Sequence, residues 1–142
     1  MRFGKIQFGD SFETAAFLGR PDHVSWIQKN YCALVYASGG FQIDYDNAKF
    51  VYLAFYIGLD DFVPKQKPMA FSKPKILGCE PGRLELSSDI DRLRLEGLFG
   101  TAKSVDVDDD ETILYYSRQG ITMEFELDAN KGRLKRWNLY PD

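Results

Sequence analysis

The sequence predicts an α+β fold of two tandem β-α-β-β-β repeats, in which an antiparallel sheet carries its helices packed on one face. Three observations predict this class. A strand-like stretch followed by a polar step and a short apolar helix occurs at 4–18 and again at 82–98. Each helical stretch ends at a glycine, and three runs of alternating apolar and polar residues follow each one. A shared order of five elements indicates an internal repeat.

The two copies begin alike, with "GKIQF" in the first and "GRLEL" in the second. A polar residue that can accept hydrogen bonds from the first amides of a helix then follows each strand. The candidates for this N-cap are Asp10 or Ser11 in the first copy and Ser87 or Ser88 in the second. Helices are expected over 11–18 and 89–98, and each ends where a glycine favours the left-handed C-cap conformation, at Gly19 and Gly100.

After each helix we expect a loop of about ten residues and then three strands separated by turns that contain glycine or asparagine. The expected strands are 31–37, 41–45 and 50–57 in the first copy and 112–117, 121–127 and 133–140 in the second. The whole chain, 1–142, is predicted to form a single domain with pseudo-repeats 4–57 and 82–140. A crossover rich in proline and lysine, 58–81, joins them, and "KILGC" within it is expected to add a short strand.

Charge and composition exclude several classes of function. The formal net charge of -3 and the pI near 5.2 argue against a non-specific nucleic-acid or anionic-membrane binder, for which a basic surplus is expected. No stretch resembles a signal peptide or a membrane span, so we expect a cytoplasmic protein. Cys32 and Cys79 match no zinc motif and are expected to be free thiols.

No catalytic constellation is visible, so we expect no catalytic residue, no metal ligand and no cofactor. His23 is the only histidine, and its place after "GRPD" favours an exposed loop residue over a general base. Asp106, Asp108 and Asp110 have the spacing of a calcium loop, but Glu111 occupies the position that needs glycine, and Ser117 the position that needs a bidentate glutamate. An EF-hand is therefore excluded, while a looser magnesium or calcium site stays open as an alternative.

The acidic run "SVDVDDDE" (104–111) falls in the loop that in the first copy reads "RPDHVSWIQKN" (20–30). Equivalent loops of opposite chemistry, held at one edge of a rigid sheet, are typical of recognition loops. Polar and aromatic residues on the sheet face away from the helices extend this surface. The candidate partner-binding residues are Asp106, Asp108, Asp109, Asp110, Glu111, Trp26, His23, Tyr52 and Tyr116.

The stretches "GKIQFGDSFETAAFLGRPD" and "GRLELSSDIDRLRLEGLFGTA" resemble a class of small bacterial α/β repeat modules. The pattern is similar to the repeats of the β-lactamase inhibitory protein, of the small outer-membrane assembly lipoprotein and of several polymorphic-toxin immunity proteins. The resemblance implies a module that caps another protein. Since this sequence has no lipobox cysteine and no cysteine pairs within its repeats, the cytoplasmic immunity proteins are the closest class.

The leading hypothesis is therefore a non-catalytic immunity or inhibitor protein that neutralises a bacterial toxin or enzyme with a basic active-site cleft. Its carboxylates would stand in for substrate phosphates and speed association. Neither nucleic acid nor a membrane is expected as a partner. Two alternatives remain: a metal-dependent hydrolase that uses the carboxylates of Asp106–Glu111, and a structural homodimer whose exposed strand edges pair between chains.

Overall fold

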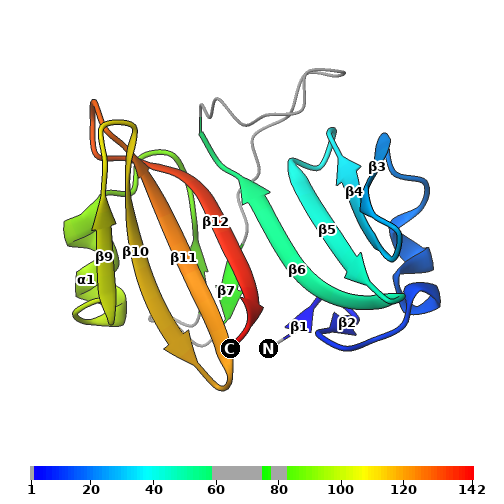
Figure 1. Ribbon diagram of the computed structural model, residues 1–142. Coiled ribbons are helices and arrows are strands. Elements are labelled where there is room, and N and C mark those ends of the chain that lie inside the picture. Colours follow the sequence, from blue (N-terminus) through cyan, green and yellow to red (C-terminus); the bar gives the residue numbers. More distant parts are fainter. Residues whose placement is uncertain (1, 59–74, 78–82) are drawn as a thin grey trace.

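The computed structural model describes residues 2–58, 75–77 and 83–142, and its main feature is one curved antiparallel sheet of eight strands (Figure 1). The strand order is β3-β4-β5-β6-β12-β11-β10-β9. The first four strands are β3 (His23–Gln28), β4 (Tyr31–Tyr36), β5 (Phe41–Asp46) and β6 (Lys49–Tyr56). The last four are β9 (Ser104–Val107), β10 (Glu111–Arg118), β11 (Ile121–Asp128) and β12 (Leu134–Pro141).

In each half of the sheet the strands follow chain order from the edge to the centre, from β3 to β6 in the first half and from β9 to β12 in the second. The two halves meet at the pair β6 and β12. In this central ladder Leu53 pairs with Leu139, and Phe55 pairs with Trp137. The sequence division into pseudo-repeats 4–57 and 82–140 stays a prediction, whereas the matching topology of the two halves of the sheet is a property of the fold.

The predicted α+β class is wrong, because the fold is mostly β. The helices of the described residues are a 3-10 helix of seven residues, η1 (Phe12–Leu18), and an α-helix of eight, α1 (Arg92–Phe99), which lie toward opposite ends of the sheet (Figure 1). Each buries one residue in the core, Ala15 in η1 and Leu95 in α1. Helices this short cannot cover an eight-stranded face, so non-helical residues complete the core.

Two small two-stranded sheets accompany the helices. They are formed by β1 (Arg2–Phe3) with β2 (Ile6–Gln7), and by β7 (Lys75–Leu77) with β8 (Arg83–Glu85). Ile6 in β2 and Leu86, directly after β8, are both fully buried in the hydrophobic core. The expected strand at "KILGC" is present as β7; the remainder of the crossover, with Cys79, lies outside the described residues, and Cys32 is a buried free thiol.

Both helices end at the predicted glycines. Gly19 and Gly100 have φ of 75° and 82°, in the region that disfavours residues with a Cβ atom. The carbonyl of each glycine accepts a hydrogen bond from a tyrosine hydroxyl, from Tyr36 to Gly19 at 3.2 Å and from Tyr116 to Gly100 at 2.9 Å. The same contact therefore ties each helix end to its half of the sheet.

The helix starts were predicted less well than the ends. Ser11 is the N-cap of η1, although its side chain makes no capping hydrogen bond. The N-cap of α1 is Asp91, whose side chain accepts from the amide of Arg94, and the predicted Ser87 or Ser88 lies one turn too early. Asp91, which is also of a residue type favoured at N-caps, lies in the same stretch and marks the start of α1.

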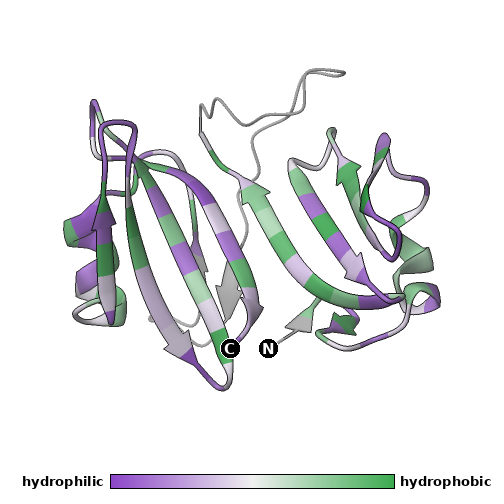
Figure 2. Ribbon diagram, in the orientation of Figure 1, coloured by the Kyte–Doolittle hydropathy of each residue, from purple (hydrophilic) through white to green (hydrophobic). Residues whose placement is uncertain are grey.

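The central strands confirm the predicted alternation of apolar and polar residues (Figure 2). Ile43 and Tyr45 of β5, and Met123 and Phe125 of β11, belong to the core cluster on the helix side of the sheet. At the centre of this core, the ring of Trp137 stacks against Phe55 at 5.4 Å and against Phe125 at 5.9 Å. Aromatic packing thus joins the two halves below the β6–β12 ladder.

The two predicted recognition loops are mostly strands, and they do not lie at one edge. Residues 23–28 form β3 and residues 104–107 form β9, which are the opposite edges of the eight-stranded sheet. Val24 and Trp26 in β3, and Val105 and Val107 in β9, do alternate with polar residues. The prediction failed because these runs are short and lie among polar residues, which are typical of loops. No helix of the described ranges is both long and apolar enough to cross a membrane.

Candidate partner-binding face

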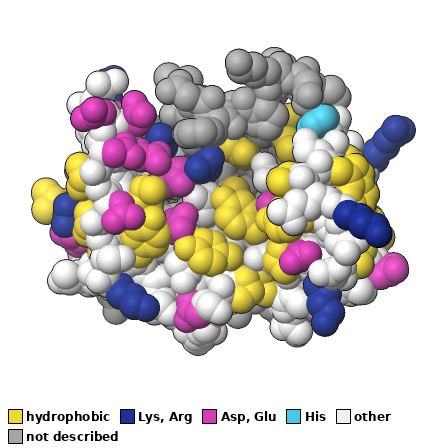
Figure 3. Space-filling view, in the orientation of Figure 1, with side chains coloured by type: hydrophobic (Ala, Val, Ile, Leu, Met, Phe, Trp, Pro, Cys, Tyr) yellow, Lys and Arg dark blue, Asp and Glu magenta, His cyan; other side chains and the backbone are white. Residues whose placement is uncertain are grey.

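The sheet face opposite the core carries a mixed aromatic and charged surface. In Figure 3, side chains classed as hydrophobic gather at the middle of the face in view, while acidic side chains gather over β9 and β10. We call this surface the open face. Its polar and aromatic members are Tyr31, Gln42, Asp44, Tyr52, Tyr56, Glu111, Tyr115, Glu124, Glu126, Lys135, Arg136, Asn138 and Tyr140.

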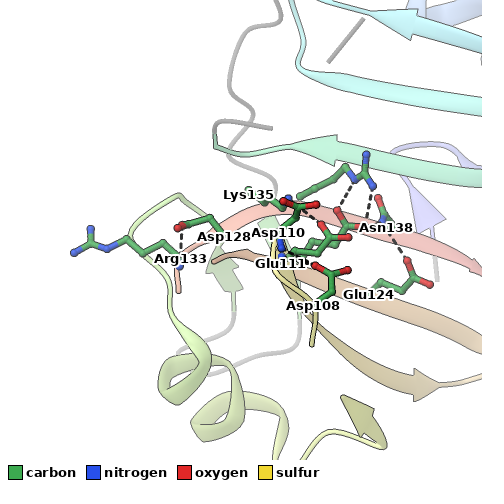
Figure 4. Close-up of polar contacts among 10 residues, drawn as sticks. Asp108, Asp110, Glu111, Glu124, Asp128, Arg133, Lys135 and Asn138 are labelled. Atoms are coloured by element: carbon green, nitrogen blue, oxygen red, sulfur yellow. Dashed lines mark hydrogen bonds and ion pairs between the residues drawn. The ribbon is translucent and has the colours of Figure 1, made fainter. Parts of the chain in front are cut away.

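A β-bulge places two consecutive cations on this face. The register of β11 with β12 shifts between Glu126, which pairs with Arg136, and Leu127, which pairs with Leu134, so Lys135 is the extra residue. Consecutive side chains of a regular strand point to opposite faces, but a bulge re-aims them. Lys135 and Arg136 consequently both bind carboxylates of the open face (Figure 4).

Arg136 forms an ion pair with the buried carboxylate of Glu126. Its Nε lies 2.8 Å from Oε2, and its Nη2 donates to Oε1 at 2.8 Å. Asn138, with 1% of its surface exposed, donates through Nδ2 to Glu126 at 2.8 Å and to Glu124 at 3.2 Å. Burial raises the pKa of Glu126, and the hydrogen bonds and charge of Arg136 offset this effect only in part.

The first half of the sheet holds a buried carboxylate at a corresponding place. Asp44 precedes the register shift between β5 and β6, as Glu126 precedes the one between β11 and β12. Its carboxylate accepts from the Tyr31 hydroxyl at 2.7 Å and from Gln42 Nε2 at 2.8 Å. Within the described ranges no lysine, arginine or histidine forms an ion pair with it. Burial therefore raises the pKa of Asp44.

Two tyrosines join these networks across the centre of the sheet. Tyr52 of β6 and Tyr140 of β12 stack with ring centroids 6.3 Å apart, and the Tyr140 hydroxyl donates to Glu124. Burial raises the pKa of both phenols, and nearby carboxylates raise it further. Both hydroxyls therefore stay protonated, and that of Tyr140 donates to Glu124 at the middle of the open face.

The acidic run ends in an ordered turn between β9 and β10, which we call the acidic turn (Asp108–Asp110). Oδ1 of Asp108 accepts from the amides of Asp110 and Glu111, both at 2.8 Å. Side-chain capping of this kind fixes the turn locally. The carboxylates of Asp109 and Asp110 are exposed, and neither has an ion-pair or hydrogen-bond partner among the described residues.

The residues on either side of the acidic turn are already engaged. Asp106 accepts from the Tyr115 hydroxyl at 3.2 Å, and the pKa of Tyr115 is raised to about 12, mainly by burial. Glu111 Oε2 lies 2.8 Å from Lys135 Nζ, in a pair that is mostly withdrawn from solvent. Of the acidic run, Asp109 and Asp110 thus have carboxylates that are available to a ligand.

The structure separates the predicted site residues into groups. Trp26 and His23 lie on β3, where Trp26 is 69% exposed and His23 Nε2 is 2.8 Å from Ser25 Oγ. Tyr52 lies at the centre of the open face, and residues 106–111 lie at the far edge from β3. Tyr116 faces the core and is 5% exposed, because the register places its neighbour Tyr115 on the open face instead.

Sequence reasoning assigned polar and aromatic residues to the sheet face away from the helices but did not name the carboxylates Asp44 and Glu126. Both are buried on that face. The bulge that brings Arg136 beside Glu126 leaves no mark in the sequence. Within the described ranges, no three His, Cys, Asp or Glu side chains are arranged to hold a metal ion.

Comparisons with known proteins bear on the fold alone. No family model and no curated protein matches the chain. A DUF4309 family protein, YjgB, from Bacillus subtilis subsp. subtilis str. 168 is similar in structure, with a TM-score of 0.58 and 12% identity over 98% of this chain and 83% of that one. A cysteine-rich secretory protein, SAV1118, from Staphylococcus aureus subsp. aureus Mu50 has a TM-score of 0.47 and 11% identity over 95% of this chain and 44% of that one.

Proposed function

We propose that the chain is a non-catalytic protein-binding module whose acidic turn and open face bind a basic region of a protein partner. In its specific form, the proposal is a cytoplasmic immunity or inhibitor protein that caps a toxin or enzyme with a basic cleft. The observation that carries it is the pair of exposed carboxylates, Asp109 and Asp110, on a turn already ordered by Asp108.

The charges of the open face differ in how they are satisfied. Glu126 and Glu111 each have a cation at 2.8 Å, so they support the fold rather than recognition. Asp109 and Asp110 have no such partner in the described ranges, and adjacent like charges repel. A cationic surface on a partner relieves this repulsion, and its charge is attracted toward the acidic turn over long range. Since the turn is preordered, binding loses little conformational freedom there.

The tyrosines of the open face extend the contact surface. Tyrosine offers a large flat ring with a polar tip and has only two freely rotating side-chain bonds, which is why it is enriched in protein interfaces. Tyr52 and Tyr140 are held by their mutual stacking, and Tyr140 also by its bond to Glu124. Their rings are therefore fixed before a partner arrives.

The experiment is affinity capture from the native lysate with wild-type protein and with the double variant Asp109→Asn/Asp110→Asn, followed by titration of the captured partner. Leaving Asp108 intact keeps the turn, so any effect reports on the two free carboxylates. We expect the variant to bind at least roughly tenfold more weakly, with a shallower dependence of the affinity on salt concentration.

The matched control is Glu13→Gln/Asp46→Asn, which removes two exposed carboxylates from the first half of the chain with the same change in net charge. Equal binding by the wild type and both variants would sink the proposal, as would equal weakening by both. The metal-hydrolase alternative has no supporting ligand cluster, because no three His, Cys, Asp or Glu side chains of the described residues are arranged to hold a metal ion. The homodimer alternative depends on pairing between exposed strand edges, so the oligomeric state, and not capture of a partner, distinguishes it.

A further inference from the structure

The two edges of the sheet differ in how they are protected against pairing with another strand. Edge strands present unpaired backbone N–H and C=O groups, and charged side chains are a common protection. At one edge, β9 contains Asp106 and runs directly into the acidic turn. At the other edge, β3 has no Asp, Glu, Lys or Arg between His23 and Gln28.

The unprotected edge is also apolar on the helix side of the sheet. Val24 pairs with Leu34 and Trp26 pairs with Cys32, so both point to the side that carries the core. Unlike their buried neighbours, they are 42% and 69% exposed. The apolar surface continues inward, because Cys32 pairs with Tyr45, whose ring lies 4.9 Å from that of the half-exposed Phe12.

We infer that β3 is a pairing edge for a second copy of this chain, with the two β3 strands antiparallel about a two-fold axis at Ser25. In this register, Val24 of each copy lies opposite Trp26 of the other, on the same face. Aromatic and β-branched residues form favourable cross-strand pairs, and the symmetry makes the pair twice. The sheet then continues through both copies.

The charge of each edge favours pairing of two β3 strands over pairing of two β9 strands. Two β9 edges brought together would face their carboxylates against one another, whereas two β3 edges meet without such repulsion. Pairing involves Val24 to Trp26, since His23 would lie opposite Ile27, where the register with β4 shifts. So short a ladder predicts a dimer that forms with increasing concentration and not an obligate one.

Sedimentation of the purified chain over a range of concentrations tests the inference. The wild type is expected to shift from monomer toward dimer and no further, and Trp26→Lys to stay monomeric. Val107→Lys, at a 71% exposed position of β9, is the matched control and should dimerise as the wild type does. A wild type that is monomeric throughout would overturn the inference, and would leave β3 to a strand of another protein.

Assemblies larger than a dimer would overturn the two-fold arrangement, because only pairing of different edges continues indefinitely. A second measurement fixes the register without depending on the stability of Trp26→Lys. In a Cys79→Ser background, Ser25→Cys is expected to give a disulfide-linked dimer on mild oxidation, because directly opposite strand residues fall within disulfide range. Ser104→Cys, on β9, should not. Equal cross-linking of both would contradict the inference.

This dimer edge and the acidic turn are on opposite edges of the sheet, so the two experiments fail independently. Loss of dimerisation in Trp26→Lys leaves Asp109 and Asp110 unchanged, and the charge variants leave β3 unchanged. A chain that dimerises but captures no partner would support the β3 interface alone.

Discussion

Asp44 and Glu126 are both buried carboxylates that precede a β-bulge, one in each half of the sheet, but only Glu126 has an arginine beside it. Asp44 instead accepts from the neutral donors Tyr31 and Gln42. At the same position in the fold, one buried carboxylate is therefore compensated by a cation and the other by neutral hydrogen-bond donors. Removing the charge should therefore affect the two halves differently, because at Glu126 the change also breaks an ion pair with an arginine.

At Glu126, loss of the charge should destabilise the fold. Glu126→Gln removes the ion pair that this carboxylate forms at 2.8 Å with Arg136, whose side chain is only 17% exposed. Breaking such a pair from one side is costly, and we expect a loss of roughly 2–3 kcal/mol in the free energy of unfolding, measured by urea denaturation at neutral pH. Glu124→Gln, whose carboxylate accepts from the neutral Tyr140 and Asn138, is the control and should cost less.

At Asp44, the effect of removing the charge should depend on pH. Burial raises the pKa of Asp44 above its ordinary value of 3.8. Between pH 3.8 and the raised pKa, the folded state therefore binds more protons than the unfolded state, and the free energy of unfolding falls as pH rises. Asp44→Asn removes this dependence. The free energy of unfolding of the variant minus that of the wild type should therefore rise with pH above 3.8 and level off above the raised pKa.

The measurement is urea denaturation at a series of pH values from about 3.5 to 7. Asp46→Asn, at an exposed position of the same strand, removes an equal charge and serves as the control. If both variants showed the same pH dependence relative to the wild type, burial of Asp44 would not be its cause.

The tyrosine contacts to the helix ends should be equal and independent. Tyr36→Phe and Tyr116→Phe each remove one hydrogen bond to a glycine carbonyl, and we expect each to cost about 1 kcal/mol. Four strands separate the two sites, so the double variant should show the sum. Thermal and urea unfolding of the three variants checks this; a double variant no worse than either single one would contradict it.

The acidic turn should depend on the side-chain oxygen of Asp108 and not on its charge. Asp108→Ala leaves two amides without their acceptor and should cost about 1 kcal/mol, whereas Asp108→Asn retains an acceptor oxygen. Comparison of the unfolding free energies of the two variants tests the point. A loss as large in Asp108→Asn as in Asp108→Ala would show that charge, not capping, orders the turn.

The central strands were predictable from sequence because their residues alternate between a buried and a solvated face, as in "FQIDY" and "ITMEFEL". The helix ends were predictable because Gly19 and Gly100 adopt a conformation that glycine favours. The edge strands β3 and β9 were not predicted, since each has one neighbour and its short alternating run lies among polar residues that are also typical of loops.

The candidate site was predictable in its composition but not in its geometry. The acidic run is visible in the sequence, yet only the structure distinguishes the capping Asp108 and the paired Glu111 from the free Asp109 and Asp110. Tyr116 was placed on the surface because a one-residue change of register exchanges the two faces of a strand. Contacts between β11 and β12, such as Glu126 with Arg136, depend on a bulge that no local pattern records.

The strand order also bears on how the chain reaches this structure. Six of the seven strand neighbours in the large sheet are consecutive in the sequence, and only β6 with β12 joins distant segments. Consecutive hairpins close with little loss of loop entropy, whereas the β6–β12 ladder requires the ends of a long intervening segment to meet. We therefore expect two locally folding meanders and one slow event that unites them, at the ladder where Phe55 meets Trp137.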